Sequence, residues 1–431
     1  MNAATLSIGD EIVLGQIDDT NARTIAERLA ELGVFRGEHR AVGDDVDAIA
    51  DALAALAQSH DVVVVTGGLG PTKDDLTRDA LNRVVDPGAE LVEDEQARVA
   101  LDRWFKGRGR AMPASNLVQA LRPRSARCLE NPNGTAPGLF AESRGAMIWC
   151  LPGPPREMVP MLERETLGML AERAGDEAMP TLAVHSYGAG ESALAERLGD
   201  LMRRDADPVI GTTASRSIVS ARIRSRGDRA TALARVAAAA REVERLWAPY
   251  AYGRGETTLA DACVGLLRAR RESLAVAESC TGGLLGAMVT DVAGSSEAFA
   301  GGWIVYSNDL KERSLQVSRS TLAAHGAVSA AVAHELALAA RTHARSTWGI
   351  GITGIAGPGG GSAAKPVGTV FIGLAGPAEV TVRRFQFPGE RVTVRDRAAK
   401  SALQWLRCAM LDQADVSLLW GFAEPPRSEG P

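Results

Sequence analysis

The sequence predicts an α/β protein built in three parts. The N-terminal part is expected to hold an open parallel sheet covered by helices, the middle part a small α+β domain, and the C-terminal part a further α/β domain. Two observations support this. A length of 431 residues exceeds the roughly 100–200 typical of one domain, and strand-like runs alternate with helix-like segments. We place the parts at 1–170, 171–254 and 255–418, followed by a mobile tail over 419–431.

The first part alternates two kinds of pattern. Residues 3–8 and 61–65 (DVVVV) are expected to be strands, and residues 20–32 and 46–57 amphipathic helices. The glycine-rich segment TGGLGPTKDD follows DVVVV directly, at the carboxyl end of a strand, where open α/β sheets bind ligands. Residues 147–161 then combine a short apolar strand, a Pro/Gly turn and the start of a helix.

The later parts repeat this alternation. Between residues 181 and 252, the runs LAVHSYG and SIVSARIRS are strand-like, and ESALAERLGDLM and ATALARVAAAAREVERL are helix-like. Further on, we expect helices over 257–269, 330–344 and 392–411, and a helix start at GGLLGAMVT. The expected strands are LAVAES, GGWIVYS, 349–353 and 368–373.

Composition argues against several classes of protein. A formal net charge of −5 and an aromatic content of 4% are unlike a nucleic-acid-binding surface. No run approaches the roughly 18 apolar residues of a membrane span, and no signal peptide is recognisable. The cysteines are odd in number and lack CxxC spacing, which favours a reducing cytoplasm over a disulfide framework or zinc site; they are Cys128, Cys150, Cys263, Cys280 and Cys408.

Ser279 is a candidate nucleophile. It stands where the strand LAVAES meets a helix opened by Gly282 and Gly283. This corner would expose the hydroxyl and direct the N–H groups of Thr281, Gly282 and Gly283 at one point, as in an oxyanion hole or a phosphate cradle. Taken alone, however, serine before Gly-Gly is more often a helix cap than a nucleophile.

A serine nucleophile needs a base to accept its proton. The segment YSNDLK offers Tyr306 and Lys311. Lysine can act only if burial or a nearby cation lowers its pKa from about 10.4; the alternative is a solvated helix residue. His325, His334 and His343 are rival bases, although the last two lie in an alanine-rich helical segment and are more typical of structural or surface residues.

Two further elements suit an anion. In TGIAGPGGGSAAKPVGTV, five glycines follow an apolar strand within eight residues. They favour backbone N–H groups wrapped around an anion, the alternative being a flexible turn. Arg391 and Arg395 lie one helical turn apart and suit a phosphate, the alternative being surface ion pairs.

Together, AESCTGG, YSNDLK, GAVS, TGIAGPGGG, KPVGTV and the G-x-R element resemble the C-terminal domain of the CinA family over about residues 256–412. Members of that family act as nicotinamide-nucleotide amidases. The resemblance implies an amidase in which Ser279 attacks the carboxamide of nicotinamide mononucleotide, Lys311 accepts the proton and Tyr306 orients the pair, with no cofactor. The implied substrate-binding residues are Thr281, Gly282, Gly283, Thr353, Gly354, Gly357 and Arg391. The sequence departs from the family in a bulky Trp303 and a polar DLKERSLQV, which leaves the pocket rim less defined.

The segments GDEIVLGQIDDTN, TGGLGPTKDD, SNLVQALRP, NPNGTAPG and LPGPPREM resemble the N-terminal domain of the same family. That domain is similar to molybdopterin-binding proteins, and members are known as ADP-ribose pyrophosphatases, which implies a second activity dependent on a divalent metal such as Mg, Mn or Co. The implied nucleotide-binding residues are Gly67, Gly68, Gly70, Pro71, Thr72 and Asn116. The implied metal ligands are Asp10, Glu11, Asp74 and Asp75. The alternative is that Asp74 and Asp75 only cap the next helix, leaving a domain that binds without turnover.

The sequence therefore predicts a cytoplasmic hydrolase of pyridine-nucleotide salvage. Its expected partners are the small molecules nicotinamide mononucleotide and ADP-ribose and a second copy of the chain in a homodimer, with no membrane or direct nucleic-acid partner. The middle part would join the two ends. One alternative is a non-catalytic pterin- or nucleotide-binding protein linked to competence or DNA repair, and another is an amidase for a different small amide.

Overall fold

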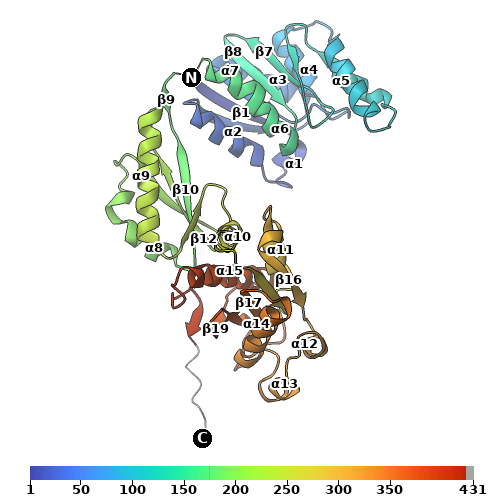
Figure 1. Cartoon of the computed structure of the whole chain (residues 1–431). Helices are drawn as coiled ribbons and strands as arrows, with labels where there is room; N and C mark the ends of the chain where they lie inside the picture. Colours follow the sequence, from blue (N-terminus) through green and yellow to red (C-terminus); the bar gives the residue numbers. More distant parts are fainter. Residues whose placement is uncertain (174, 424–431) are drawn as a thin grey trace. The chain divides into compact units, whose positions relative to one another are not determined.

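The computed structural model describes residues 1–173 and 175–423 and confirms the predicted α/β class and its three parts (Figure 1). The chain divides into two compact units. One comprises Met1–Thr181 and Arg224–Val236, and the other Leu182–Ile223 and Ala237–Pro431. Among the helices of the described ranges, none combines the length and the apolar character needed to span a bilayer.

The N-terminal part is built on a six-stranded sheet in the order β2-β1-β3-β8-β7-β6. Four neighbouring strands run parallel, and they are β1 (Asn2–Ile8), β2 (Phe35–Val42), β3 (Val62–Thr66) and β8 (Ala146–Leu151). Strands β7 (Gly138–Ser143) and β6 (Arg127–Leu129) add to β8 in antiparallel fashion. The predicted parallel sheet therefore has an antiparallel edge.

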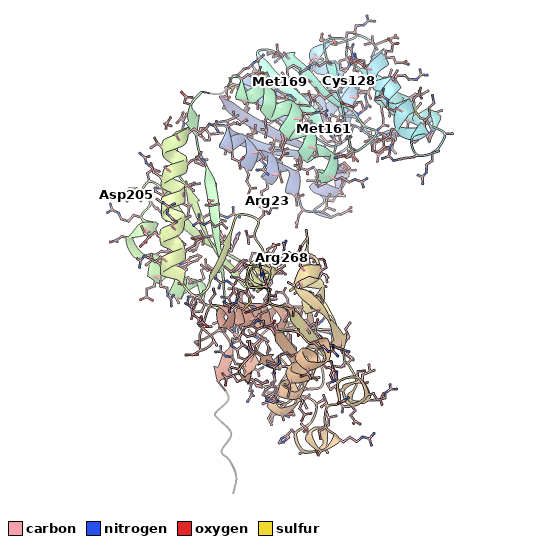
Figure 2. All side chains as sticks on the ribbon, in the orientation of Figure 1. Arg23, Cys128, Met161, Met169, Asp205 and Arg268 are labelled. Carbon is pink, nitrogen blue, oxygen red and sulfur yellow. The ribbon has the colours of Figure 1, made fainter. Side chains whose placement is uncertain are left out.

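Helices cover both faces of this sheet. Helices α2 (Thr20–Glu31) and α6 (Pro155–Met161) pack on one face, and α3 (Val46–Ser59) and α4 (Thr77–Val85) on the other. Val62 and Val64 face α2 and α6, while Val63 and Val65 face α3 and α4. Met161 of α6, labelled in Figure 2, is fully buried. Every position of β3 is apolar or buried because both of its faces are covered.

The remaining elements of this part are shorter or lie at its periphery. They are α1 (Asp10–Val13), β4 (Val92–Glu93), α5 (Glu95–Lys106), η1 (Ala114–Ala120), β5 (Leu121–Arg122), η2 (Leu162–Leu167), α7 (Gly168–Ala171), β9 (Glu177–Ala178) and β13 (Gly227–Asp228).

The middle part forms a four-stranded sheet in the order β11-β12-β10-β14. Its strands are β11 (Val209–Ser215), β12 (Ile218–Arg224), β10 (Thr181–Tyr187) and β14 (Ala251–Arg254). Its helices are α8 (Glu191–Leu198), η3 (Gly199–Met202) and α9 (Arg229–Trp247). The two helices α8 and α9 are tied together where the Trp247 indole donates to the Leu194 carbonyl at 2.9 Å.

The C-terminal part has a mixed six-stranded sheet in the order β16-β15-β17-β18-β19-β20. Strand β15 (Leu274–Glu278) runs parallel to both β16 (Phe299–Ile304) and β17 (Trp348–Gly354). The antiparallel strands β18 (Thr369–Ala375), β19 (Val380–Gln386) and β20 (Gly421–Ala423) follow.

Two helical layers cover this sheet. One is formed by α10 (Leu259–Arg270), α11 (Leu284–Thr290) and α15 (Arg391–Met410). The other contains α12 (Asn308–Leu315), α13 (Arg319–His325) and α14 (Ala330–Ala344). A short η4 (Ser295–Glu297) precedes β16. Because β15 and β17 run parallel and adjacent, their carboxyl ends open at the same edge of the sheet, where ligands usually bind.

Several elements were not predicted because their sequences lack a clear apolar period. Strand β2 (FRGEHRAV) is polar and lies at the sheet edge, and α12 (NDLKERSL) is a short, polar helix. The expected tail at 419–431 is wrong for its first residues, because Gly421–Ala423 pair with β19 and Trp420 packs against Phe387 with ring centroids 5.9 Å apart. Residues 424–431 lie outside the described part of the chain.

Candidate functional sites

Ser279 lies at the carboxyl end of β15, where the buried strand turns toward helix α11. Its amide donates to the Ile352 carbonyl of β17 at 3.0 Å, and the residue is 8% exposed. The turn is made by Gly282 and Gly283, whose φ angles of +60° and +89° are disfavoured for residues with a Cβ. The Gly-Gly pair thus allows the sharp corner that keeps Ser279 at the sheet edge.

Lys311 contacts this serine from helix α12. Its Nζ donates to Ser279 Oγ at 3.1 Å and to the Val305 carbonyl at 2.8 Å. The lysine is 1% exposed, and burial lowers the pKa of its amine. Within residues 1–173 and 175–423, no carboxylate forms an ion pair with it. The condition for a lysine base, a desolvated amine beside the hydroxyl, is therefore met.

Some backbone amides of the corner form hydrogen bonds within the protein, and others do not. The Gly282 amide donates to the Ser279 carbonyl at 3.1 Å, so the expectation that it points at a ligand is wrong. In the described part of the chain, the Thr281 and Gly283 amides donate to no protein acceptor. Thr281 Oγ1 is also buried without a partner. The Gly283 amide and two buried groups of Thr281 are thus unpaired in the described part of the chain.

The N-terminus of α11 is closed by a buried carboxylate. Glu278 is 1% exposed and accepts from the Leu285 amide at 3.1 Å and the Gly286 amide at 2.8 Å. Because it already satisfies the first free amides of the helix, this helix end cannot hold a phosphate from a ligand. The carboxylate stabilises the corner that carries Ser279.

The two candidate arginines have different contacts. Arg395 donates to the Thr281 carbonyl from Nε and Nη2, at 3.1 and 2.7 Å, and so supports the corner. Arg391 donates to the Gly357 carbonyl and to the Tyr306 hydroxyl, each at 2.9 Å. Arg391 therefore links the glycine-rich loop to the segment that precedes Lys311.

The expected role of Tyr306 in orienting the serine–lysine pair is not supported by its side-chain contacts. Its ring is turned to Arg391 and the residue is 59% exposed. Only its backbone carbonyl faces the Lys311 amine, at 3.4 Å. The phenol does not orient the serine–lysine pair.

The glycine-rich loop is positioned by close packing. Gly357 has φ of +84° and its carbonyl receives Arg391, which places the loop beside Tyr306. A Cβ at Gly354 would lie 2.7 Å from Val370 Cγ2, so this position needs glycine for packing. Thr353 is 1% exposed and its hydroxyl donates to the Ala327 carbonyl at 2.7 Å, which leaves it unavailable as a donor to substrate.

The rival histidines have other contacts. His343 packs edge-on against Trp303 at 6.0 Å between ring centroids, and the His325 carbonyl accepts from Lys365 at 2.9 Å. Trp303 thus packs against α14. The hydroxyl of Ser279 bonds to Lys311 rather than to an imidazole.

A separate cavity of about 630 Å³ lies in the N-terminal part. The glycine-rich loop after β3 forms one wall, including Gly67, Gly68, Gly70 and Pro71. Gly67 has φ of +97°, and a Cβ there would lie 2.4 Å from the Ile8 carbonyl oxygen. Glycine therefore lets the loop pass close to β1 and bring its backbone to the cavity, as the sequence predicts for this segment.

Asp75, expected to be a metal ligand, is instead committed to this loop. Its carboxylate accepts from the Gly70 amide at 2.7 Å, the Thr72 amide at 2.8 Å and the Thr72 hydroxyl. These bonds fold GPTKDD back on itself. Asp75 was expected to bind a metal and Thr72 a nucleotide. The structure instead shows that both residues fix the shape of the loop.

Negative charge gathers in and beside this cavity, which Glu11, Asp44 and Asp74 line and the expected metal ligand Asp10 does not. Asp10 and Asp44 exchange bonds, with each backbone amide donating to the other's carboxylate at 3.1 and 3.2 Å. Burial raises the pKa of Asp44, and the charges of Asp10, Glu11 and Asp74 raise it further. Among the described residues, no group of three or more histidines, cysteines or acids is placed to hold a metal ion. The residues as arranged do not fit a resident metal.

Other predicted and unpredicted residues also shape this cavity. Asn116 does not line it; its buried amide donates to Gln119 Oε1 at 2.9 Å, and Gln119 is the residue that reaches the cavity. Glu157, which sequence reasoning missed, is 8% exposed and accepts from Asn131 at 2.8 Å. It is the glutamate of the LPGPPREM segment, which was the available signal. Asp44 was also missed, although it follows β2 within AVGDD.

These observations define an α/β protein with a buried serine–lysine pair in its C-terminal part and a glycine-loop cavity in its N-terminal part. Three family models match the chain in order: "Probable molybdopterin binding domain" over residues 4–172, "Damage-inducible protein CinA KH domain" over 182–253 and "CinA C-terminal domain" over 256–410. The chain belongs to the CinA family.

Full-length relatives agree. The chain is 41% identical over 415 residues to a "CinA-like protein" of Geobacter metallireducens, which covers 95% of this chain and 100% of that protein. A "CinA-like protein" of Cyanothece is 40% identical over 415 residues, covering 95% and 99%. A crystal structure of the protein CinA from Thermoplasma acidophilum covers 39% of this chain and 97% of that chain, at 36% identity and a TM-score of 0.36.

We expect Glu278→Gln to destabilise the C-terminal part. The glutamine NH₂ would face one of the two backbone amides that the carboxylate now accepts, and an unsatisfied buried donor costs about 1–3 kcal/mol. The measurement is the shift in the unfolding midpoint of the full chain. Glu297→Gln is the matched control, because Glu297 forms an exposed ion pair with Arg268, worth about 0–1 kcal/mol. Equal shifts in the two variants would contradict the role of Glu278.

Proposed function

We propose that the C-terminal part hydrolyses the carboxamide of nicotinamide mononucleotide to the carboxylate and ammonia. The observation that supports this most directly is the 3.1 Å contact between the Lys311 amine and the Ser279 hydroxyl in a site where burial lowers the lysine pKa. A neutral amine can accept the hydroxyl proton. The fold and the CinA membership support the assignment; the substrate is our proposal.

The reaction proceeds in two stages. In the first, Ser279 Oγ attacks the carboxamide carbon while Lys311 takes the hydroxyl proton; the tetrahedral intermediate then collapses, and the lysine returns the proton to the departing ammonia. In the second, Lys311 removes a proton from water, which attacks the resulting ester; the lysine then returns this proton to Ser279 Oγ as the acid is released. The free amides of Thr281 and Gly283 are the donors proposed for the oxyanion.

The mononucleotide phosphate is assigned to the other side of the site. The α11 N-terminus is occupied by Glu278, so the remaining donors are Arg391 and the loop that begins at Gly357. Arg391 has the planar fork that suits a phosphate. Its present bonds to Gly357 and Tyr306 hold it beside the loop. An amidase for another small amide would not need this arginine.

Ser279→Ala and Lys311→Met should each lower ammonia release from nicotinamide mononucleotide by roughly three orders of magnitude, since the nucleophile and its base act as a unit. Methionine at 311 should preserve the fold because it replaces a buried amine by an apolar chain of similar length. Ammonia is assayed alongside the unfolding midpoint. Asp309→Asn, in the exposed ion pair with Arg313 on the same helix, is the control. Undiminished release by Ser279→Ala would refute the mechanism, and a preference for free nicotinamide would indicate a different amide substrate.

The pH dependence follows from the direction of the lysine shift. Only the neutral amine accepts a proton, and burial favours it by lowering the Lys311 pKa below the usual value of 10.5. The value of kcat/KM should therefore rise with pH until it passes the folded-state pKa of Lys311, and then level off. A pH–rate profile of the full chain tests this. Lys311→Arg, which stays protonated, should be inactive at every pH, and a rate that falls as pH rises from 6 to 8 would contradict the model.

For the N-terminal part, we propose binding of a nucleotide that contains a diphosphate, with ADP-ribose as the substrate of a hydrolysis that needs a divalent ion from solution. The cavity of about 630 Å³ beside a glycine-rich loop favours this class of ligand. A divalent ion would neutralise the phosphates among the acidic side chains. The competing assignment is a binding protein for pterins or nucleotides without turnover.

ADP-ribose should be split to AMP and ribose phosphate by the full chain only when Mg²⁺, Mn²⁺ or Co²⁺ is added. Asp75→Ala should weaken ADP-ribose binding about tenfold or more, because it removes the three bonds that shape the loop. Asp74→Asn should lower turnover and leave binding within about twofold, since Asp74 lines the cavity while the Gly70 and Thr72 amides donate to Asp75. Calorimetry and product analysis give both readouts. Binding with no turnover under any of the metals would place the domain in the binding class.

A further inference from the structure

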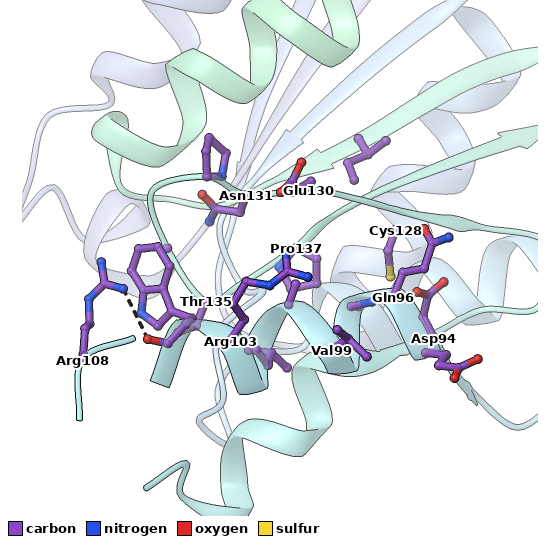
Figure 3. Close-up of a pocket in the computed structure, with 18 residues that line it drawn as sticks. Asp94, Gln96, Val99, Arg103, Arg108, Cys128, Glu130, Asn131, Thr135 and Pro137 are labelled. Carbon is purple, nitrogen blue, oxygen red and sulfur yellow. Dashed lines mark hydrogen bonds between the residues drawn. The ribbon is translucent and has the colours of Figure 1, made fainter. Parts of the chain in front are cut away.

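A second cavity of about 670 Å³ lies in the N-terminal part, between helix α5 and the loop over residues 130–137 (Figure 3). Its volume is within the range of small-molecule sites, about 300–1,000 Å³. One side is formed by successive turns of α5, and the opposite side by Cys128, Asn131, Thr135 and Pro137. None of the residues assigned above to nucleotide or metal binding lines it.

One end of this cavity is aromatic and cationic. The guanidinium of Arg108 lies over the Trp104 ring, with Cζ 3.5 Å from the ring centroid, and donates to the Trp104 carbonyl at 3.3 Å. Arg103, the residue before the tryptophan, also lines the cavity. In the described part of the chain, its guanidinium forms no ion pair or hydrogen bond. A ligand at this end meets an indole, a stacked guanidinium and an unpaired positive charge.

The other end of the cavity is largely committed to the protein. Asp94 caps α5 by accepting from the Ala97 amide at 3.0 Å and pairs with Arg122 at 2.8 Å. Glu130 lies 3.7 Å from Arg164. Glu95 is the acid that stays unpaired in the described residues, and it lies about 12 Å along the helix from Arg103. The free charge at the aromatic end is therefore positive.

The two cavities of the N-terminal part meet at one residue. Thr135 lines both, with Gly134 and Pro137 on the side of α5 and Ala136 on the side of the glycine loop. The loop that carries Thr135 is held in place by Asn131, whose amide donates to the Ala136 carbonyl at 2.9 Å and to Glu157 at 2.8 Å. In Figure 3, Thr135 lies toward the end of the cavity that holds Arg103 and Arg108. The two cavities are thus neighbours that share Thr135 as a lining residue.

We propose that the cavity along α5 is the base-binding subsite for the nucleotide whose diphosphate lies on the glycine loop. The aromatic base stacks against the Trp104–Arg108 pair, the sugar passes Thr135, and Arg103 offsets part of the phosphate charge. Indole and guanidinium planes both stack on nucleobases. This inference rests on the proposed nucleotide binding by the N-terminal part and adds the residues that select an aromatic base.

The test compares two probes that share a diphosphate: ADP-ribose and inorganic pyrophosphate. Both are titrated into the full chain by calorimetry with EDTA present, so that no turnover occurs. Stacking on one aromatic side chain is worth about 1–3 kcal/mol, so Trp104→Leu should weaken ADP-ribose binding about tenfold and leave pyrophosphate binding unchanged. Trp104→Phe should restore most of the loss because it keeps an aromatic face.

Phe105→Ala is the matched control, since Phe105 follows Trp104 on α5 and lines neither cavity; it should bind both probes as the unmodified chain does. Equal ADP-ribose affinity in Trp104→Leu and the unmodified chain would overturn the base subsite while leaving the nucleotide site in place. An equal loss for both probes would overturn it as well, because it would indicate a distorted loop. Absence of ADP-ribose binding by the unmodified chain would remove the proposed nucleotide site itself, and the subsite with it.

Discussion

The chemistry proposed for the C-terminal part depends on one lysine amine that the protein buries without a carboxylate partner. Lys311 is 1% exposed, and its hydrogen bonds go to neutral oxygens, those of Ser279 Oγ and the backbone carbonyls of Val305 and Tyr306. A carboxylate in contact would have favoured the charged form and abolished its use as a base. The packing of the surrounding helices and sheet compensates for the free energy of burying this amine. The same packing holds α12 so that the amine lies at the end of β15.

The groups around this pair divide into those that hold the corner and those left free for a ligand. Glu278 and Arg395 are charged, yet both act on the backbone of the corner, one on amides and the other on the Thr281 carbonyl. The Thr281 and Gly283 amides stay unpaired within the described residues, as does Thr281 Oγ1. Preorganised donors of this kind are most effective where the protein, not the ligand, has already fixed their direction.

The N-terminal part differs from the C-terminal part in the charge of its site. Several acidic side chains surround its cavity at close range. Asp75 accepts hydrogen bonds from its own loop, whereas Asp44 has a raised pKa that reflects burial and neighbouring charge. The acidic side chains disfavour an anionic ligand on the glycine-loop side, whereas the cavity along α5 offers arginine and tryptophan side chains. The two cavities therefore differ in the chemistry they can recognise, although Thr135 lines both.

The sequence by itself determined the elements with a strong local signal. DVVVV, LAVAES and the long helices were predictable because burial on both faces or on one stripe produces a clear apolar period. Glycine at the corners was also predictable, since Gly67 and Gly283 adopt positive φ angles that other residues avoid. Ser279 and Lys311 were candidates on the sequence, although each residue taken alone is more often a helix cap or a solvated lysine.

Only the tertiary structure decided between such readings, because partners far apart in the chain set the state of each polar group. The Lys311 amine is buried beside the Ser279 hydroxyl, 32 residues away in sequence, because α12 packs against the end of β15. Asp75 turned out to shape its loop, and Asn116 to support Gln119, because both find acceptors or donors inside their own segment. Sequence patterns report which side chains are apolar, but the hydrogen-bond partner and burial of a polar group are properties of the packed chain.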